Sequence, residues 1–206
     1  MSRPDLYASF AELTRAERSG VDYRVRLLRR DAGVVIVAPH GGGIEPGTSE
    51  LAAAIAGEQF SLYCFEGLKA GDNGGLHVTS HRFDDPACLR LVESSTHVVT
   101  IHGCGDLEGT GGPDLSTSIG GRDTALGEAI RRALVAGGFG IGDRPEMPGT
   151  DPRNICNRGR RAMGVQLEIS RSLRDRLLQS VPAGPAGEFA QFASAIRRGI
   201  VAHKAP

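Results

Sequence analysis

The feature that most constrains the fold is an unbroken β-branched run that ends in a histidine and three glycines. Residues 34–37 read VVIV, a pattern typical of a strand buried on both faces, as in the interior of a parallel sheet. His40 follows shortly after, and the glycines at 41–43 allow the chain to turn sharply at the carboxyl end of this strand. Open α/β sheets bind their ligands at that edge. We therefore expect His40 to lie in a ligand-binding crevice.

The segment after the glycines supplies a carboxylate and predicts a helix. Pro46 precedes an alanine-rich stretch, and proline is favoured in the first turn of a helix, so we expect a helix from Pro46 to about residue 57. Imidazole and carboxylate are common zinc ligands, which makes Glu45 a candidate to join His40. Glu50 is a competing carboxylate, and a helix-start carboxylate favoured by the helix dipole is the alternative interpretation of Glu45.

Strand patterns alternate with helix patterns along the chain. This order predicts an α/β fold with an open, mixed but mostly parallel sheet and helices on both faces. The chain has 206 residues, of which 40% are hydrophobic, enough for one domain with a substantial core. We expect a single domain over residues 1–206, with 1–20 as an N-terminal helical extension. The expected strands are 23–30, 34–39, 61–65, 76–79, 97–102, 116–119 and 165–169, and the expected helices are 6–17, 46–57, 86–92, 123–136, 173–178 and 188–201.

Two of these strands and one long connection have special features. Residues 23–30 alternate between apolar and basic side chains, which is typical of a partly exposed edge strand. Antiparallel pairing of 23–30 or 116–119 would make the sheet mixed. Residues 139–161 are rich in Gly, Pro, Asn and Arg and are longer than an ordinary connection, so we expect a functional loop there.

The charge balance gives no general attraction to nucleic acid or to an anionic membrane surface. Twenty-four basic residues balance 24 acidic ones, so the net charge is zero, and we expect neither nucleic acid nor a membrane as partner. Residues 1–20 are polar, and no apolar run approaches membrane-spanning length. We expect cytoplasmic synthesis without a signal peptide, which is compatible with action outside the cell after lysis. The four cysteines lack a CxxC pairing, which favours buried free thiols over disulfides.

A second and a third strand carry further polar residues at or near their carboxyl ends. Residues 97–102 end in His102, which is followed by glycine, and residues 165–169 carry Glu168 between two apolar residues. If these strands are neighbours of 34–37 in one parallel sheet, their side chains converge with Glu45. Two imidazoles and a carboxylate would then be ligands, and a separate carboxylate would handle protons, as in catalytic zinc sites. Burial of Glu168 costs several kcal/mol without a partner, and strand alternation could instead turn it to solvent.

Other polar residues have less defined roles. His77 and His81 lie in the segment LHVTSHRFDDP and are expected in the pocket or on its rim, whereas His97 and His203 are interpreted as surface or structural residues. The long loop contains NICNRG, with an amide at 154 and a guanidinium at 158. Arg158 is suited to bidentate binding of a substrate carboxylate, and a solvated basic loop is the alternative.

Taken in order, the motifs APHGGGIEPGTSELAAAIAG, LHVTSHRFDDP, VVTIHGC, NICNRG and GVQLEISRSLR resemble the phage-type poly-γ-glutamate hydrolase family over residues 23–174. That family is similar in fold to zinc carboxypeptidases. The resemblance implies one zinc ion (Zn2+) per chain. The ligands that it implies are His40, Glu45 and His102. Glu168 would be the general base with Arg158 acting beside it, and Arg158 and Asn154 would contact substrate carboxylates. His77 is a further candidate for substrate binding because of its place in the segment LHVTSHRFDDP.

One spacing departs from the wider carboxypeptidase pattern. Four residues, 41–44, separate the first histidine from the glutamate here, whereas two do so in carboxypeptidases. The choice between Glu45 and Glu50 therefore stays open at this point.

The expected reaction is metal-assisted hydrolysis of a γ-glutamyl amide in poly-γ-glutamate, an anionic polypeptide. Three other functions fit parts of the sequence. The same metal site would suit an amidohydrolase of small N-acyl or N-formyl amino acids. Cys104 or Cys156 with His102 would suit a cysteine hydrolase. A non-catalytic phage-related or nucleic-acid-binding accessory protein is the third, although the chain has no nucleic-acid-binding motif.

Overall fold

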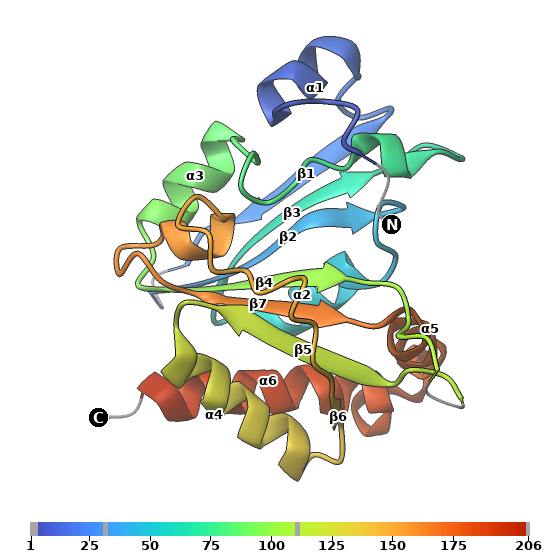
Figure 1. The fold of residues 1–206 in the computed structure, drawn as a ribbon, viewed down its shortest axis with the longest axis vertical. Helices are drawn as coiled ribbons and strands as arrows, with labels where there is room; N and C mark the ends of the chain where they lie inside the picture. Colours follow the sequence, from blue (N-terminus) through green and yellow to red (C-terminus); the bar gives the residue numbers. More distant parts are fainter. Residues whose placement is uncertain (1–3, 31–32, 110–111, 205–206) are drawn as a thin grey trace.

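The computed structural model describes residues 4–30, 33–109 and 112–204, and these form an α/β fold around one mixed sheet (Figure 1). Seven strands are found within the described residues, in the order β1-β3-β2-β4-β7-β5-β6 across the sheet. The strands are β1 Tyr23–Leu28, β2 Val34–Gly42, β3 Ser61–Gly67, β4 His97–Gly103, β5 Ser116–Gly121, β6 Gly140–Ile141 and β7 Val165–Ile169. The predicted class of fold is confirmed.

Parallel strands occupy the centre of the sheet, and antiparallel pairs lie toward its sides. Strands β3, β2, β4 and β7 run parallel to one another. β1 pairs antiparallel with β3 at one edge, and β5 pairs antiparallel with β7 near the other. These are the two segments that the sequence identified as candidates for antiparallel pairing, and the predicted edge position of β1 is confirmed. The carboxyl ends of β2, β4 and β7 consequently meet at the same side of the sheet.

Helices cover both faces of the sheet (Figure 1). One face packs against α2, α4, α5 and α6, and the other against α1, α3 and two short 3-10 segments. The α-helices are α1 Phe10–Ala16, α2 Thr48–Ala56, α3 Pro86–Glu93, α4 Thr124–Ala136, α5 Arg171–Gln179 and α6 Glu188–Lys204. The 3-10 segments are η1 Asn73–Leu76, η2 Ile155–Arg158 and η3 Val181–Ala186. No helix among the described residues is both long enough and apolar enough to cross a bilayer.

The β-branched run of β2 shows how the two cores are built. Val34 and Ile36 point into the core shared with α2, α4 and α6, whereas Val35 and Val37 point into the core shared with α1 and α3. All four side chains are fully buried. Because side chains alternate along a strand, a run without polar residues is required when both faces are covered.

Local capping chemistry fixes two helix starts where the sequence places them. The side chain of Asp85 accepts a hydrogen bond from the backbone N–H of Ala87, and Pro86 occupies the first turn of α3. At α4, the side chain of Asp123 accepts a hydrogen bond from the N–H of Leu126.

Residues 76–79, predicted as a strand, are not one. Leu76 is the last residue of η1, and residues 77–79 follow as irregular chain that pairs with no strand of the described part of the chain. Side chains satisfy their backbone groups instead, because the N–H of Thr79 donates to Asp5 and the carbonyl of Val78 accepts from His40. The sequence prediction of a strand was wrong here because tertiary partners replaced the ladder of a sheet.

Other element boundaries differ from the predictions. Helix α2 begins at Thr48 rather than at Pro46, because Gly47 precedes it in the left-handed region, with φ 96°. Helix α1 is shorter than predicted, and α6 continues to Lys204. The predicted long loop contains the short strand β6 and the 3-10 segment η2.

Candidate active site

The predicted convergence of strand ends is present in the sheet. β4 lies between β2 and β7, and His102 of β4 is the register partner of Glu168 in β7. In β7, Leu167 and Ile169 enter the core under the helices. Since strand side chains alternate, Glu168 lies on the opposite face, where it lines a pocket rather than facing open solvent.

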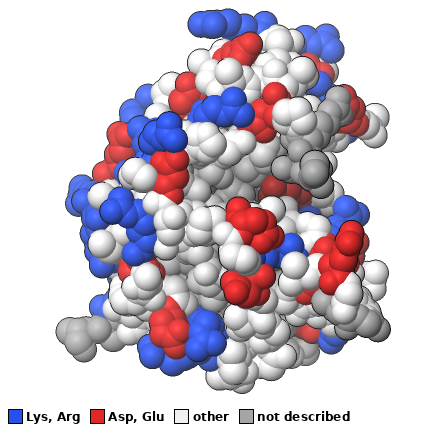
Figure 2. Space-filling model, in the orientation of Figure 1, with Lys and Arg blue, Asp and Glu red and all other residues white. Residues whose placement is uncertain are grey.

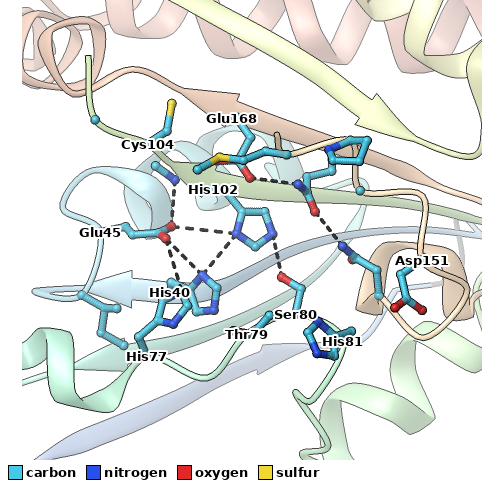
Figure 3. Close-up of a pocket in the computed structure, with 18 of the residues that line it drawn as sticks. His40, Glu45, His77, Thr79, Ser80, His81, His102, Cys104, Asp151 and Glu168 are labelled. Carbon is cyan, nitrogen blue, oxygen red and sulfur yellow. Dashed lines mark hydrogen bonds and ion pairs between the residues drawn. The ribbon is translucent and has the colours of Figure 1, made fainter. Parts of the chain in front are cut away.

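Three side chains bring their donor atoms together at this edge (Figure 3). His40 Nδ1 lies 3.1 Å from Glu45 Oε1 and 3.2 Å from His102 Nδ1, and His102 Nδ1 lies 3.9 Å from Glu45 Oε2. A tetrahedral zinc with ligand distances of about 2.0–2.1 Å has ligand atoms about 3.3 Å apart. The donor set therefore fits a zinc ion in both chemistry and spacing.

Hydrogen bonds orient the two histidines for this role. His40 Nε2 lies 2.9 Å from the carbonyl oxygen of Val78, so that its N–H donates to the carbonyl and the lone pair stays on Nδ1. Ser80 Oγ lies 3.4 Å from His102 Nε2. Bonds of this kind to the distal ring nitrogen fix the tautomer and ring plane of metal-binding histidines.

Electrostatics at the donor set favour a cation. Burial alone would raise the pKa of Glu45, but His40, His102 and the N–H of Gly103 outweigh it and lower this pKa to about 2. Burial and then His40 lower the pKa of His102 to about 3. Burial opposes protonation of His40 as well, yet the adjacent Glu45 carboxylate raises its pKa.

Glu168 is a buried carboxyl group that can exchange a proton with the pocket. Its residue is 7% exposed, and burial, followed by the repulsion of Glu45, raises its pKa to about 8. Gln166 Nε2 donates to Glu168 Oε1 at 2.9 Å, and Asn154 Nδ2 donates to Gln166 Oε1 at 2.8 Å. This chain of amides holds the carboxylate in one orientation.

A buried arginine braces the segments that carry these residues. The guanidinium of Arg174, in α5, donates to the backbone carbonyls of Pro46, Cys104 and Ile169. Each carbonyl lies within two residues of Glu45, His102 or Glu168. A Cβ at position 103 would clash with this guanidinium, which is why a glycine follows His102.

The pocket has a volume of about 570 Å³ and contains two of the three predicted substrate-binding residues, Asn154 and His77. His81, also predicted at the pocket, lines it too. Neither Lys nor Arg is found among the described lining residues. The lining residues are His40, Ile44, Glu45, Gly74, His77, Thr79, Ser80, His81, His102, Gly103, Cys104, Gly105, Met147, Pro148, Gly149, Thr150, Asp151, Asn154, Gln166 and Glu168.

Arg158, predicted to act in the site, does not line the pocket. Its Nη2 lies 3.3 Å from Glu93 Oε1, because η2 packs against α3 and directs this side chain to that helix. Figure 2 shows Lys and Arg gathered at the left of the view, over α3 and the η2 segment, while acidic side chains occupy the middle of this face. The competing carboxylate Glu50 lies in the first turn of α2 and does not line the pocket either.

Residues that the sequence did not single out complete the site. Ser80, Gln166 and Arg174 lie inside the motifs quoted above, but nothing in their spacing indicates their roles. His77 also lies close to the donor set, because donor atoms of His40, Glu45 and His77 all fall within 4.8 Å of one another. Cys104 and Cys156, considered as nucleophiles, are buried, and burial raises the pKa of each thiol to about 12. Protonated thiols argue against the cysteine hydrolase.

The fold and the site define a family of hydrolases. The model of the poly-gamma-glutamate hydrolase family matches residues 7–188, and the chain belongs to this family. Two solved structures resemble it over nearly the whole chain. The bacteriophage poly-gamma-glutamate hydrolase has a TM-score of 0.88 at 33% identity and covers 97% of this chain and 98% of its own. The zinc-free apo form of YndL has a TM-score of 0.86 at 31% identity and covers 98% and 100%.

Relatives from Bacillus subtilis (strain 168) share the same region. YmaC, a UPF0714 protein, is 36% identical over 178 residues, which cover 84% of this chain and 72% of YmaC. YoqZ, an SPbeta prophage-derived UPF0714 protein, is 35% identical over 179 residues, which cover 85% of this chain and 62% of YoqZ. The family and the phage structure support a hydrolase with a polypeptide substrate.

Proposed function

We propose that the chain is a zinc-dependent hydrolase that cleaves the γ-glutamyl amide bonds of poly-γ-glutamate. The observation that carries this proposal is the donor set of His40, Glu45 and His102 beside a separate buried carboxylate, Glu168. The family, the phage hydrolase and the zinc-free form of YndL support it.

His40 Nδ1, His102 Nδ1 and a Glu45 oxygen would hold the zinc. When bound at such a site, zinc lowers the pKa of water and polarises a carbonyl group. The residues themselves contribute orientation: Val78 and Ser80 fix the two rings, and the N–H of Gly103 donates to Glu45 Oε2 at 2.7 Å.

Glu168 would be the general base and then the general acid. A carboxylate whose pKa lies near the working pH can accept a proton from a nucleophile and return it to the leaving amine. The pKa of about 8 places Glu168 in that range, and Gln166 keeps its carboxylate directed at the pocket.

Recognition of the substrate would rest on neutral polar groups rather than on arginine. Each γ-linked glutamate leaves an α-carboxylate free beside the amide, and the described lining residues include no Lys or Arg to bind it. Asn154 retains a second amide N–H, beyond the one that it gives to Gln166, which can donate to such a carboxylate. The Nδ1–H of His77 donates to Asp5, so the Nε2 of His77 can accept a hydrogen bond from an amide N–H of the polymer. These two side chains are the proposed contacts to the polymer.

The test is the length of poly-γ-glutamate chains after incubation with the purified protein. We expect shortened polymer before free glutamate appears, loss of activity with a chelator and recovery with zinc. An N-acyl amino acid amidohydrolase would instead leave the polymer intact and act on small amides.

Glu168→Gln should lower kcat by roughly 10²- to 10⁴-fold with zinc content unchanged, as expected for loss of a general base. Glu50→Gln in α2 is the matched control. Full activity after chelation, or in Glu168→Gln, would reject the mechanism.

A further inference from the structure

An acidic residue near the N-terminus reaches the edge of the site. The Asp5 side chain is only 2% exposed, although the residue lies close to the chain end. Its Oδ1 accepts from His77 Nδ1 at 2.6 Å, and its Oδ2 accepts from the N–H of Thr79 at 2.8 Å and from Arg82. The family match begins at residue 7, so Asp5 precedes it.

The bond to Asp5 determines what His77 presents to the pocket. A carboxylate on Nδ1 places a proton there and leaves Nε2 directed away from Asp5. The His77 ring stacks on His40 with centroids 4.0 Å apart, and His77 Nε2 lies 4.0 Å from Glu45 Oε1 (Figure 3). His77 therefore lies beside the donor set and lines the pocket, with an unprotonated Nε2 that can accept a hydrogen bond.

We propose that Asp5 is a positioning residue that holds His77 in the tautomer and orientation needed to contact the substrate. The substrate role of His77 rests on the function proposed above. The segment that carries His77 has no strand partner, so its position depends on side-chain bonds such as those from Asp5. The N-terminal segment thereby completes the binding pocket.

A purely structural anchor is the competing explanation, and the chain contains one for comparison. Asp84 Oδ1 accepts from the N–H groups of Phe10, at 2.7 Å, and Ala11, at 3.2 Å, and so fixes the start of α1. Asp84 does not line the pocket. Asp84→Asn therefore loosens the same N-terminal region without changing His77.

The experiment compares Asp5→Asn and Asp5→Ala with Asp84→Asn, alone and combined with His77→Gln. On poly-γ-glutamate we expect both Asp5 variants to raise KM by roughly tenfold, the effect of one lost charge-assisted hydrogen bond, with kcat little changed. Zinc affinity, measured by competition with a chelator, should stay at the wild-type level. Asp84→Asn should leave KM unchanged, and Asp5→Asn should add nothing to the KM of His77→Gln.

A second measurement does not depend on activity. Long-range ¹H–¹⁵N NMR correlations assign the proton of His77 to Nδ1 or Nε2, and we expect Nδ1–H in the wild type and in Asp84→Asn but not in Asp5→Ala. If the protein cleaves no polymer, the proposed function fails while this measurement still tests the link between Asp5 and His77.

Three results would overturn the inference. One is equal KM values for the Asp5 and Asp84 variants. Another is additive effects of Asp5→Asn and His77→Gln. The third is a loss of zinc affinity in both Asp5→Asn and His77→Gln, which would make His77 a metal ligand rather than a substrate contact.

Discussion

The amino and carboxyl ends of the central parallel strands, which we call the amino edge and the carboxyl edge of the sheet, each gather two histidines and a carboxylate. The two clusters differ in whether an arginine side chain lies among them. At the amino edge, His97 begins β4, Asp123 caps α4, and His203 lies in the last turn of α6, with donor atoms within 4.8 Å of one another. The guanidinium of Arg161 fills this cluster, because its Nη1 lies 2.6 Å from Asp123 Oδ2 and 3.1 Å from His97 Nδ1. A fixed cation already satisfies Asp123 and His97.

At the carboxyl edge, the arginine stays outside the donor set. Arg174 donates to three backbone carbonyls behind the site, and His40, His102 and Glu45 face one another without a Lys or Arg among the described lining residues. The same residue types thus form a completed ion-pair network at one edge and a candidate metal centre at the other. The position of the nearest guanidinium makes the difference.

The largest effect should come from the histidines of the carboxyl edge. We expect His40→Ala or His102→Ala to abolish the binding of about one zinc per chain and to lower activity on poly-γ-glutamate by at least roughly 10²-fold, since both the ion and its chemistry are lost. Elemental analysis and polymer sizing measure this. His97→Ala is the matched control, and equal zinc loss there would contradict the contrast between the edges.

The second-largest effect should follow substitution of Arg174. Arg174→Met leaves buried carbonyls at Pro46, Cys104 and Ile169 without a donor, so we expect the free energy of unfolding to fall by about 2–5 kcal/mol and zinc affinity to fall with it. Arg174→Lys should recover part of the loss. Arg171→Met, which removes an exposed pair with Asp175, should cost less than about 0.5 kcal/mol in denaturant unfolding.

In the absence of zinc, the free energy of unfolding should depend on pH through Glu168, at the carboxyl edge. Between about pH 4.5 and 8, the unfolded chain has released the proton of Glu168 whereas the folded chain keeps it, so the free energy of unfolding falls as pH rises. The shift of this pKa from 4.5 to about 8 sets an upper limit of about 5 kcal/mol on the change. Unfolding of the wild type and of Glu168→Gln at several pH values isolates it. A difference between the two proteins that stays constant with pH would refute the assignment.

The smallest effect should follow removal of the guanidinium from the amino edge. Arg161→Ala leaves the buried Asp123 without its cation, and because Arg161 is itself 35% exposed we expect a loss of about 1–2 kcal/mol. Equilibrium dialysis should then detect a second, weaker zinc per chain that the wild type lacks. If the variant binds no additional zinc, the arginine is not what separates the two edges.

The elements that are defined by local patterns could be predicted from the sequence. The β-branched run of β2, the cap at Asp85 and the apolar stripe of α4 each depend on neighbours a few residues away. The prediction of a strand at 76–79 was wrong because backbone groups of this segment bond to Asp5 and His40, which are distant in the sequence. Hydrophobic pattern alone cannot distinguish such a segment from a strand.

The candidate site divides in the same way. His40, His102 and Glu168 were identified because each stands at or near the carboxyl end of an apolar strand, and parallel strands bring those ends together. Arg158 was misplaced because the direction of its side chain depends on the packing of η2 against α3. Asp5 gave no signal, since its partner His77 lies 72 residues away.

By itself, the sequence determined a covered, mostly parallel sheet and the histidines at the ends of its strands, because alternation and strand direction follow from local chemistry. Only the tertiary structure decided which carboxylates and guanidinium groups meet those histidines. The reason is physical: the pKa of a buried group and the occupancy of a donor cluster depend on charges a few ångströms away, and such neighbours come from segments that folding alone brings together.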